Sequence, residues 1–183
     1  MREAVVAGDR SGMTSPRLAM RSIRPDDAAA LHEAYCDADL MRWWSCAPHA
    51  SIADTEAYLA PRIDDAAWRS WTITLAGDDS AIGTISTTQR RAGVAEIGYM
   101  LVRSAWGHGY AREAVSRLID RLINDERQRR IFADVDPDNA ASLHLLDSLG
   151  FRREALLRDE WETHIGVRDS VILGLLAREW GEG

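Results

Sequence analysis

Apolar and polar residues follow one another along this chain with two different periods, one typical of helices and one typical of strands. From Tyr110 onward, apolar residues recur at helical spacing and charged residues occupy the opposite face. The apolar set consists of Ala111, Ala114, Val115, Leu118, Ile119 and Leu122. This spacing predicts an amphipathic helix that packs one face on a sheet and exposes the other face to water.

Seven β-rich runs separated by turn residues predict strands at 18–23, 68–75, 81–88, 94–102, 130–135, 151–158 and 169–177. Further helices are predicted at 25–35, opened by Pro25, at 51–67, capped by Ser51 and Asp54, and at 139–149, closed by Gly150. Residues 18–23 are expected to form an edge strand, and residues 1–16 a flexible leader. The order of the elements predicts one domain at 17–183, a twisted sheet flanked by helices.

The composition is that of a globular protein and argues against several classes of function. Its 22 Lys and Arg and 29 Asp and Glu give a net charge of −7, which disfavours nucleic acid or an anionic membrane as the main partner. No apolar run is long enough for a membrane span. Cys36 and Cys46 lack metal or redox spacing and are interpreted as free thiols of a cytoplasmic protein. The acidic balance suits a cationic or amine substrate.

The clearest chemical feature is a glycine-containing turn between the β-rich run that ends at Val102 and the helix from Tyr110. It reads Trp106-Gly107-His108-Gly109-Tyr110-Ala111. Unpaired N–H groups at a helix start can hold a pyrophosphate, and glycine lets the backbone approach it closely. A P-loop is excluded because Gly-Lys-Ser/Thr is missing, and a dinucleotide-binding fingerprint fits poorly. An ordinary tight turn is the alternative.

A second cluster, at residues 136–151, contains Asn139-x-x-Ser142 and Leu149-Gly150-Phe151. With Glu96-Ile-Gly-Tyr99, the glycine turn and Gly166-x-Arg-Asp169, these ordered motifs resemble the GNAT superfamily of acyl-CoA N-acyltransferases. The likeness is to its ribosomal-protein N-acetyltransferase (RimJ/RimL-like) branch and runs from Leu18 to Trp180. It implies an α/β (α+β) GNAT fold, whose twisted, mixed, mostly antiparallel sheet has splayed central strands that hold acetyl-CoA.

The resemblance also assigns the acetyl-CoA contacts. The backbone of Met100, Leu101 and Val102 is expected to pair with the pantetheine like an added strand. The pyrophosphate is expected on Trp106, Gly107, His108, Gly109, Tyr110 and Ala111, although Trp106 replaces the family's Gln or Arg and is expected to pack. Asn139 is expected to contact acetyl-CoA, and Ser142 to donate a hydrogen bond to the leaving thiolate, a role for which the sequence offers no convincing tyrosine. Helix capping is the alternative role for both.

Glu96 is the candidate general base, acting through water, because acyl transfer requires a neutral amine. Deprotonation at pH 7 costs about 4.6 kcal/mol for a lysine-type amine and about 1.4 kcal/mol for an α-amine. A surface glutamate paired with an arginine is the alternative interpretation of Glu96. No metal is expected, since His49 and His164 lack partners at ligand spacing.

Two segments that flank the acetyl end in this fold are expected to select the acceptor. One is 37–50, with Trp43 and Trp44 as its aromatic residues, and the other is 158–164, with Asp159, Glu160 and Trp161. Aromatic rings beside acids suit a cation with an apolar body. Packing in the core is the alternative for the two tryptophans of the first segment.

The predicted function is acetyl transfer from acetyl-CoA to a primary amine by direct attack in a ternary complex, in a monomer or homodimer. The branch resemblance favours the α-amine of a protein or peptide N-terminus as the acceptor. A small amine, such as a polyamine, an antibiotic or an amino acid, is the first alternative. The second is a catalytically silent CoA-binding regulatory module. A charged-tRNA acceptor is disfavoured by the acidic balance.

Overall fold

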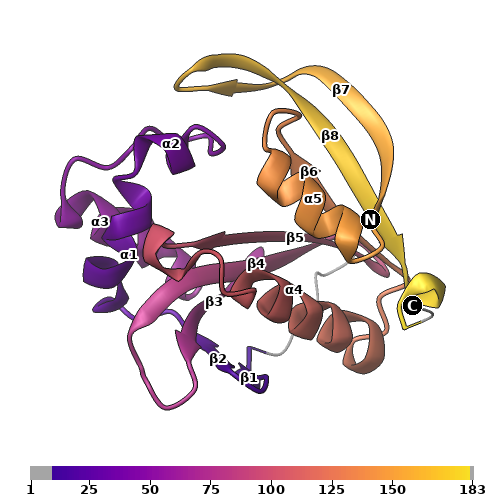
Figure 1. Cartoon of the computed structure of the whole chain (residues 1–183), viewed down its shortest axis with the longest axis horizontal. Helices are drawn as coiled ribbons and strands as arrows, with labels where there is room; N and C mark the ends of the chain where they lie inside the picture. The colour runs from indigo at the N-terminus through magenta and orange to yellow at the C-terminus, as the bar shows by residue number, and fades with distance from the viewer. Residues whose placement is uncertain (1–9, 182–183) are drawn as a thin grey trace.

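The computed structural model describes residues 10–181 and contains a mixed sheet of eight strands in the order β1-β2-β3-β4-β5-β6-β8-β7 (Figure 1). The strands are β1 (Met13–Thr14), β2 (Leu18–Ser22), β3 (Trp68–Leu75), β4 (Ala81–Arg91), β5 (Val94–Leu101), β6 (Arg130–Val135), β7 (Arg152–Thr163) and β8 (Gly166–Leu176). Neighbours are antiparallel except β5 and β6, which run parallel. The expected mixed, mostly antiparallel sheet is confirmed.

Helices cover both faces of the sheet. They are α1 (Asp27–Tyr35), α2 (Ala38–Met41), α3 (Ile52–Ile63), α4 (Tyr110–Asp120), which a π-helical segment continues, and α5 (Ala140–Ser148). Thr72 of β3 donates a hydrogen bond to Asp27 of α1, whereas its neighbour Trp71 faces the Arg121 guanidinium after α4. Successive strand residues point to opposite faces, so α1 and α4 lie on opposite sides of the sheet.

The local signals for helix ends are confirmed. Ser51 and Asp54 form the predicted capping box, and Gly150 follows α5 in the left-handed region with φ 86°. Pro61 removes one N–H from the last turn of α3, and this helix ends at Ile63, earlier than the predicted residue 67. Over residues 10–181, no helix is long and apolar enough to cross a membrane.

The structure of residues 10–16 differs from the flexible leader that was predicted for them. Met13 is 2% exposed, and β1 pairs with β2, so the sheet extends one strand beyond β2. The Trp71 indole N–H donates to the Ser11 carbonyl at 3.2 Å, and the Arg121 guanidinium donates to the same oxygen at 2.6 Å. The prediction of a flexible leader is therefore wrong for residues 10–16. The prediction that β2 is an edge strand is also wrong, because β1 lies outside it. Residues 1–9, for which a leader was also predicted, lie outside the described residues.

The last two strands form one long hairpin rather than two short strands joined by a loop. β7 runs to Thr163 and β8 begins at Gly166, so most of the predicted loop 158–164 belongs to β7. The register against β8 shifts between Leu157 and Trp161, and Asp159 within this bulge has φ 52°. β7 is the outermost strand and its side chains are largely exposed, so it lacks the alternating pattern that predicts a strand.

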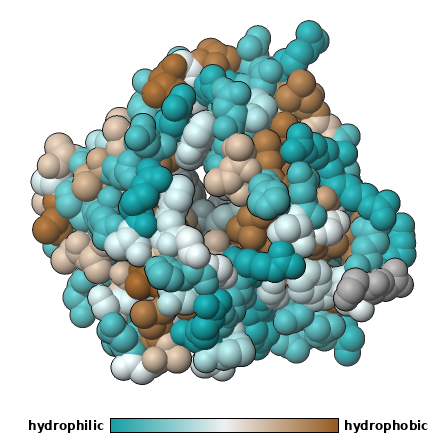
Figure 2. Space-filling view, viewed as in Figure 1, coloured by the Kyte–Doolittle hydropathy of each residue, from teal (hydrophilic) through white to brown (hydrophobic). Residues whose placement is uncertain are grey.

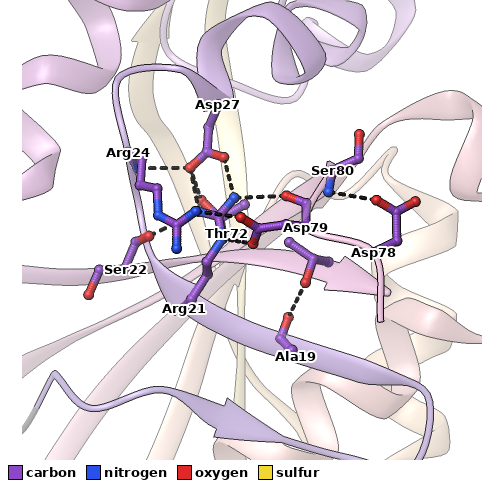
Figure 3. A network of polar contacts seen from close by, with 10 residues as sticks. Ala19, Arg21, Ser22, Arg24, Asp27, Thr72, Asp78, Asp79 and Ser80 are labelled. Carbon is purple, nitrogen blue, oxygen red and sulfur yellow. Dashed lines mark hydrogen bonds and ion pairs between the residues drawn. The ribbon is translucent and has the colours of Figure 1, made fainter. Parts of the chain in front are cut away.

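An ion-pair network fixes α1 to the sheet (Figure 3). The buried Asp27 carboxylate accepts hydrogen bonds from the Arg21 guanidinium at 2.7 and 2.9 Å and from the Thr72 hydroxyl at 2.7 Å. Asp79, in the turn between β3 and β4, pairs with both Arg21 and Arg24. Burial acts to raise the pKa of Asp27, but the hydrogen bonds from Arg21, the Arg24 N–H and Thr72 outweigh it, and the pKa is lowered.

The central strands β5 and β6 separate after three residue pairs, of which Glu96 with Phe132 is the last. β4 continues to pair with β5 as far as Leu101, and β8 continues to pair with β6 as far as Val135. Each strand therefore keeps its outer partner while the two inner edges diverge. This is the expected splay, and it leaves backbone groups of both strands facing a gap.

Candidate active site

The gap between β5 and β6 opens into a cleft of about 640 Å³. Figure 2 shows a hollow near the centre of the face that it draws. Residues from both sides of the sheet line the cleft. We define the turn half by Tyr99, Trp106, Gly107, Gly109, Tyr110, Ala111, Asn139 and Ser142. We define the hairpin half by Trp43, Trp44, Trp68, Arg90, Glu96, Asp134, Trp161 and Arg168. The cleft thus joins the two faces of the sheet through the gap.

The β5 edge faces the gap with alternate backbone groups. The Val102 N–H donates to the Ile82 carbonyl, and the Gly98 carbonyl accepts from the Ser86 hydroxyl, so the even-numbered groups face β4. In an antiparallel ladder the intervening groups then point outward, here at Tyr99 and Leu101. Of the three residues expected to pair with pantetheine, only Leu101 therefore directs its backbone into the gap. The Met100 side chain also lines the cleft, whereas Val102 is buried behind it.

The turn before α4 has the features of an anion site. Gly107 and Gly109 have φ 80° and 77°, and no side chain caps the N-terminus of α4. A Cβ at Gly107 would meet no atom within 4 Å, so the turn borders open space. Free N–H groups and the helix dipole therefore face the cleft. The His108 side chain is exposed and outside the lining, stacked on the Tyr110 ring with 5.3 Å between centroids.

Trp106 both packs and borders the cleft. Its indole N–H donates to the Leu101 carbonyl at 2.9 Å, and the Arg103 guanidinium lies 4.1 Å from the centre of its ring. The ring is 39% exposed and lines the cleft. Its hydrogen bond fixes the turn against the end of β5, and the role of Trp106 toward acetyl-CoA stays a prediction.

Asn139 and Ser142 meet at the start of α5 and line the cleft together. Asn139 is the N-cap residue, and its Oδ1 accepts a hydrogen bond from the Ser142 N–H at 3.2 Å. The alternative capping role is therefore present for Asn139. The Ser142 hydroxyl is not used by the cap and stays available to the cleft.

Tyr99 is a cleft residue that the sequence interpretation missed, although it ends the Glu96-Ile-Gly-Tyr99 motif. Its hydroxyl oxygen is buried and has no hydrogen-bond partner among residues 10–181. Burial raises the pKa of Tyr99 to about 12, and the Ser142 side chain beside it acts in the opposite direction. An unpaired buried hydroxyl next to Ser142 is costly unless a ligand completes it. Alternation along β5 places this ring on the face of the sheet opposite to Glu96, but that pattern alone does not mark it as a cleft residue.

Glu96 lies in the hairpin half, 7% exposed, at the last point where β5 and β6 pair. The Arg90 guanidinium Nε donates to its Oε2 at 2.5 Å, and the same guanidinium lies 5.6 Å from the centre of the Trp68 ring. Glu96 thus has the arginine partner that the alternative interpretation expected, but it is buried rather than on the surface. A carboxylate at the base of a cleft, held by one arginine, is placed to meet a bound amine.

The segments expected to select an acceptor contribute unequally. Trp43, Trp44 and Trp161 line the cleft, and Trp44 also packs on the core. Asp159 and Glu160 lie in the exposed bulge of β7 and are not brought to the cleft. This outcome follows from the strand that replaces the predicted loop, because a bulge turns successive side chains in different directions.

The charges that line the cleft balance. The lining contains five arginines and five acids, namely Arg42, Arg62, Arg90, Arg112, Arg168, Asp65, Glu96, Asp134, Asp136 and Asp169. Arg168 pairs with Asp136 at 2.8 Å, as Arg90 does with Glu96. The cleft is therefore formally neutral, unlike the acidic chain as a whole. Across the described part of the chain, no group of three His, Cys, Asp or Glu could hold a metal ion.

Comparison with known proteins points to one family. A family model described as "Acetyltransferase (GNAT) domain" matches residues 17–152. The uncharacterised N-acetyltransferase p20 of Bacillus licheniformis is 32% identical over 90% of this chain and 95% of its own length.

Two solved structures with bound CoA species share the fold. Spermidine N-acetyltransferase from Vibrio cholerae, in complex with CoA and spermine, has a TM-score of 0.76 at 22% identity, over 90% of this chain and 98% of that one. Mycobacterium smegmatis RimJ, in complex with CoA-disulfide, also has a TM-score of 0.76, at 24% identity, over 91% of this chain and 85% of that one. The equal scores do not distinguish their acceptor classes.

Proposed function

The chain belongs to the GNAT acetyltransferase family, and from this premise we propose that it acetylates the α-amine of a peptide or protein N-terminus. We place it by the same proposal in the RimJ/RimL-like branch. The observation that carries the choice of acceptor is the formally neutral cleft. A cytoplasmic location and a monomeric or homodimeric state stay predictions.

GNAT acetyltransferases use acetyl-CoA, which supplies an acetyl group activated as a thioester, and three features of the turn half fit this donor. The outward backbone groups of Tyr99 and the outward N–H of Leu101 can pair with an extended amide chain, while the Leu101 carbonyl already accepts from the Trp106 indole. The uncapped start of α4 can receive a diphosphate. The buried Tyr99 hydroxyl lies beside Ser142 and has no other polar partner among the described residues, so an atom of this donor in the gap can complete its hydrogen bonding.

The two hydroxyls of the turn half supply hydrogen bonds to the leaving sulfur in this proposal. Tyr99 and Ser142 lie side by side where the inner edges of β5 and β6 diverge. A thiol with pKa near ~8.5 leaves readily, so these groups are expected to help modestly. Ser142 keeps the role expected for it, and Tyr99 joins it as the second donor.

Glu96 accepts the proton of the acceptor amine, through water. The ammonium first gives one proton through water to Glu96; as the new N–C bond forms and the C–S bond breaks, the nitrogen gives up its second proton to water, and the thiolate gains one from solvent or from the hydroxyl pair. For an α-amine the deprotonation costs about 1.4 kcal/mol at pH 7, which a single carboxylate already engaged with Arg90 can support.

The charge of the cleft discriminates between acceptor classes. A polyamine carries several ammonium groups and is bound best where carboxylates outnumber cations. Within the hairpin half, Arg90 and Arg168 offset Glu96 and Asp134, so this half suits one ammonium group beside neutral or acidic groups, as at a peptide N-terminus. Because tryptophan side chains line the cleft, a small amine that packs against an aromatic ring is the second candidate acceptor. A silent CoA-binding module is disfavoured because Glu96 and Ser142 both line the cleft.

The test is a thiol-release assay with acetyl-CoA against peptides with free N-termini, polyamines, aminoglycosides and amino acids. Turnover with peptides, and none with the same peptides lacking the α-amine, is the expected result. Preferred turnover of polyamines would replace the proposed acceptor with a small polycation. Tight acetyl-CoA binding without turnover on any amine would favour the regulatory module.

A further inference from the structure

Asp134 lies across the gap from Glu96, on the same face of the sheet. Glu96 pairs with Phe132, and Asp134 is two residues further along β6, where alternate residues share a face. Asp134 therefore points into the hairpin half at a level where β5 and β6 have already separated, and it lines the cleft.

Neutral groups hold both carboxylate oxygens of Asp134. The Ser170 hydroxyl donates to Oδ1, and the indole N–H of Trp161 donates to Oδ2 at 3.0 Å. Within the described residues Asp134 forms no ion pair, whereas Glu96 and Asp136 each pair with an arginine. A carboxylate has about four lone-pair positions, so Asp134 can accept further hydrogen bonds while its own geometry stays fixed.

The other two cleft acids without an arginine partner have structural tasks. Asp65 accepts the Ala67 N–H at 2.8 Å and so holds the turn before β3. Asp169 accepts the Asp159 N–H at 2.9 Å and so holds the bulge of β7. Asp134 alone among these three is bound by two side chains, from Ser170 and Trp161, and this leaves its carboxylate directed at the cleft.

Trp161 provides a second surface for a cation. Trp161 is 44% exposed and lines the cleft, and its bond to Asp134 fixes the orientation of the indole. Figure 1 shows the hairpin of β7 and β8 reaching over toward the side of the molecule that carries α2. An indole face beside a carboxylate attracts an organic ammonium through both cation–π and charge-assisted hydrogen bonding.

We propose that Asp134 and Trp161 form the site that binds the ammonium group of the acceptor, which we call the ammonium site. This inference rests on the proposed function and divides the work between two carboxylates. Asp134 binds the protonated amine, and Glu96, which Arg90 already engages, receives its proton through water. The amine is then neutral and leaves the ammonium site to attack.

The test compares Asp134→Asn with Glu160→Gln, an acid on the same hairpin that the structure places outside the lining. With a peptide acceptor, Asp134→Asn should raise KM about 10- to 100-fold with a much smaller change in kcat, because a charged hydrogen-bond acceptor is lost. Glu160→Gln should leave KM within about twofold. Trp161→Phe, which keeps a ring but removes the N–H, should give an intermediate rise in KM.

Two further measurements separate binding from folding and from chemistry. Calorimetric binding of acetyl-CoA should be equal in all three variants and the parent, and Asp134→Glu should restore part of the acceptor affinity. A peptide with an N,N-dimethylated N-terminus stays cationic and forms no stable amide, so it should inhibit the parent competitively and Asp134→Asn weakly. The desamino peptide should inhibit neither.

The outcomes separate this inference from the proposed function. Parental turnover on peptides with an unchanged KM in Asp134→Asn would overturn the ammonium site and leave the proposed function standing. An equal rise in KM in Glu160→Gln would also overturn it, since a diffuse acidic field would then suffice. A parent that turns over no peptide would overturn the proposed function and the ammonium site with it.

Discussion

The two halves of the cleft present different chemical groups, mainly backbone in one and side chains in the other. The turn half presents mostly backbone, namely the outward edge of β5 and the uncapped N-terminus of α4. The hairpin half presents side chains from segments far apart in the sequence, among them Trp43, Glu96, Asp134 and Trp161. Most of the turn half thus comes from one stretch, residues 99–111, to which the start of α5 adds Asn139 and Ser142, whereas the hairpin half requires the sheet to be assembled first.

The difference corresponds to the two ligands. A donor shared by a whole family can be held by backbone groups, since these are present whatever the side chains are. An acceptor that differs between relatives has to be recognised by side chains. The predicted consequence is that substitutions which disturb the backbone of the turn before α4 abolish donor binding, while those in the hairpin half change acceptor kinetics and leave the donor bound.

The largest effect is expected for Gly109→Asp. A carboxylate at the start of α4 would repel the diphosphate and place a side chain at φ 77°, so affinity for acetyl-CoA should fall at least about 100-fold. Calorimetry measures it directly. Gly77→Asp is the matched control, because Gly77 has φ 87° and open space but lies in the turn after β3, away from the cleft. Equal loss of binding in both variants would assign the effect to strain.

Glu96→Gln should come next, with a loss of about 100-fold in kcat, the usual size for a general base. The loss should be greatest at low pH, where more of the acceptor is protonated, and acetyl-CoA should bind as in the parent. Steady-state kinetics between pH 6 and 9 measure both. A pH profile identical to that of the parent would remove Glu96 from the role of base and leave it as a partner of Arg90.

The fold was predictable where a pattern is local. The β-rich runs at 68–75 and 130–135 and the capping box at Ser51 each depend on residues close in sequence, and the structure has these elements. β1 escaped prediction because two residues carry no period, although Met13 is buried. β7 extends further than predicted because its exposed side chains give no apolar alternation, so its polar end was interpreted as a loop.

The site was predictable to the same degree. The glycine turn and Glu96 belong to motifs with a recognisable order, and both border the cleft. Tyr99 and Asp134 were missed because each is one residue of an alternating strand, and alternation alone does not distinguish a cleft from solvent or core. Their significance depends on partners distant in sequence, Ser142 for Tyr99 and Trp161 for Asp134.

Tyr99→Phe and Ser142→Ala sharpen the comparison within the turn half. Each should lower kcat by about tenfold or less, because a thiolate is already a good leaving group. The two losses should be less than additive, since both hydroxyls serve the same atom. Tyr99→Phe removes a buried hydroxyl without a partner, so its melting temperature should equal or exceed that of the parent. A loss of kcat together with lower stability would instead indicate a packing role for this ring.

The smallest functional effect, with a clear effect on stability, is expected for Asp27→Asn. This change weakens the network that fixes α1 to the sheet on the face opposite α4, so acetyl-CoA binding should stay unchanged. At pH 7 the melting temperature should fall by roughly 3–12 °C, from the loss of charged hydrogen bonds.

Because the folded pKa of Asp27 is lowered, its stabilisation is present above the unfolded pKa of about 3.9 and is lost as pH falls through the folded value. The difference between parent and variant should therefore shrink below about pH 4. Melting curves from pH 7 to 3 measure this, and a difference independent of pH would show that Asp27 acts through packing rather than charge.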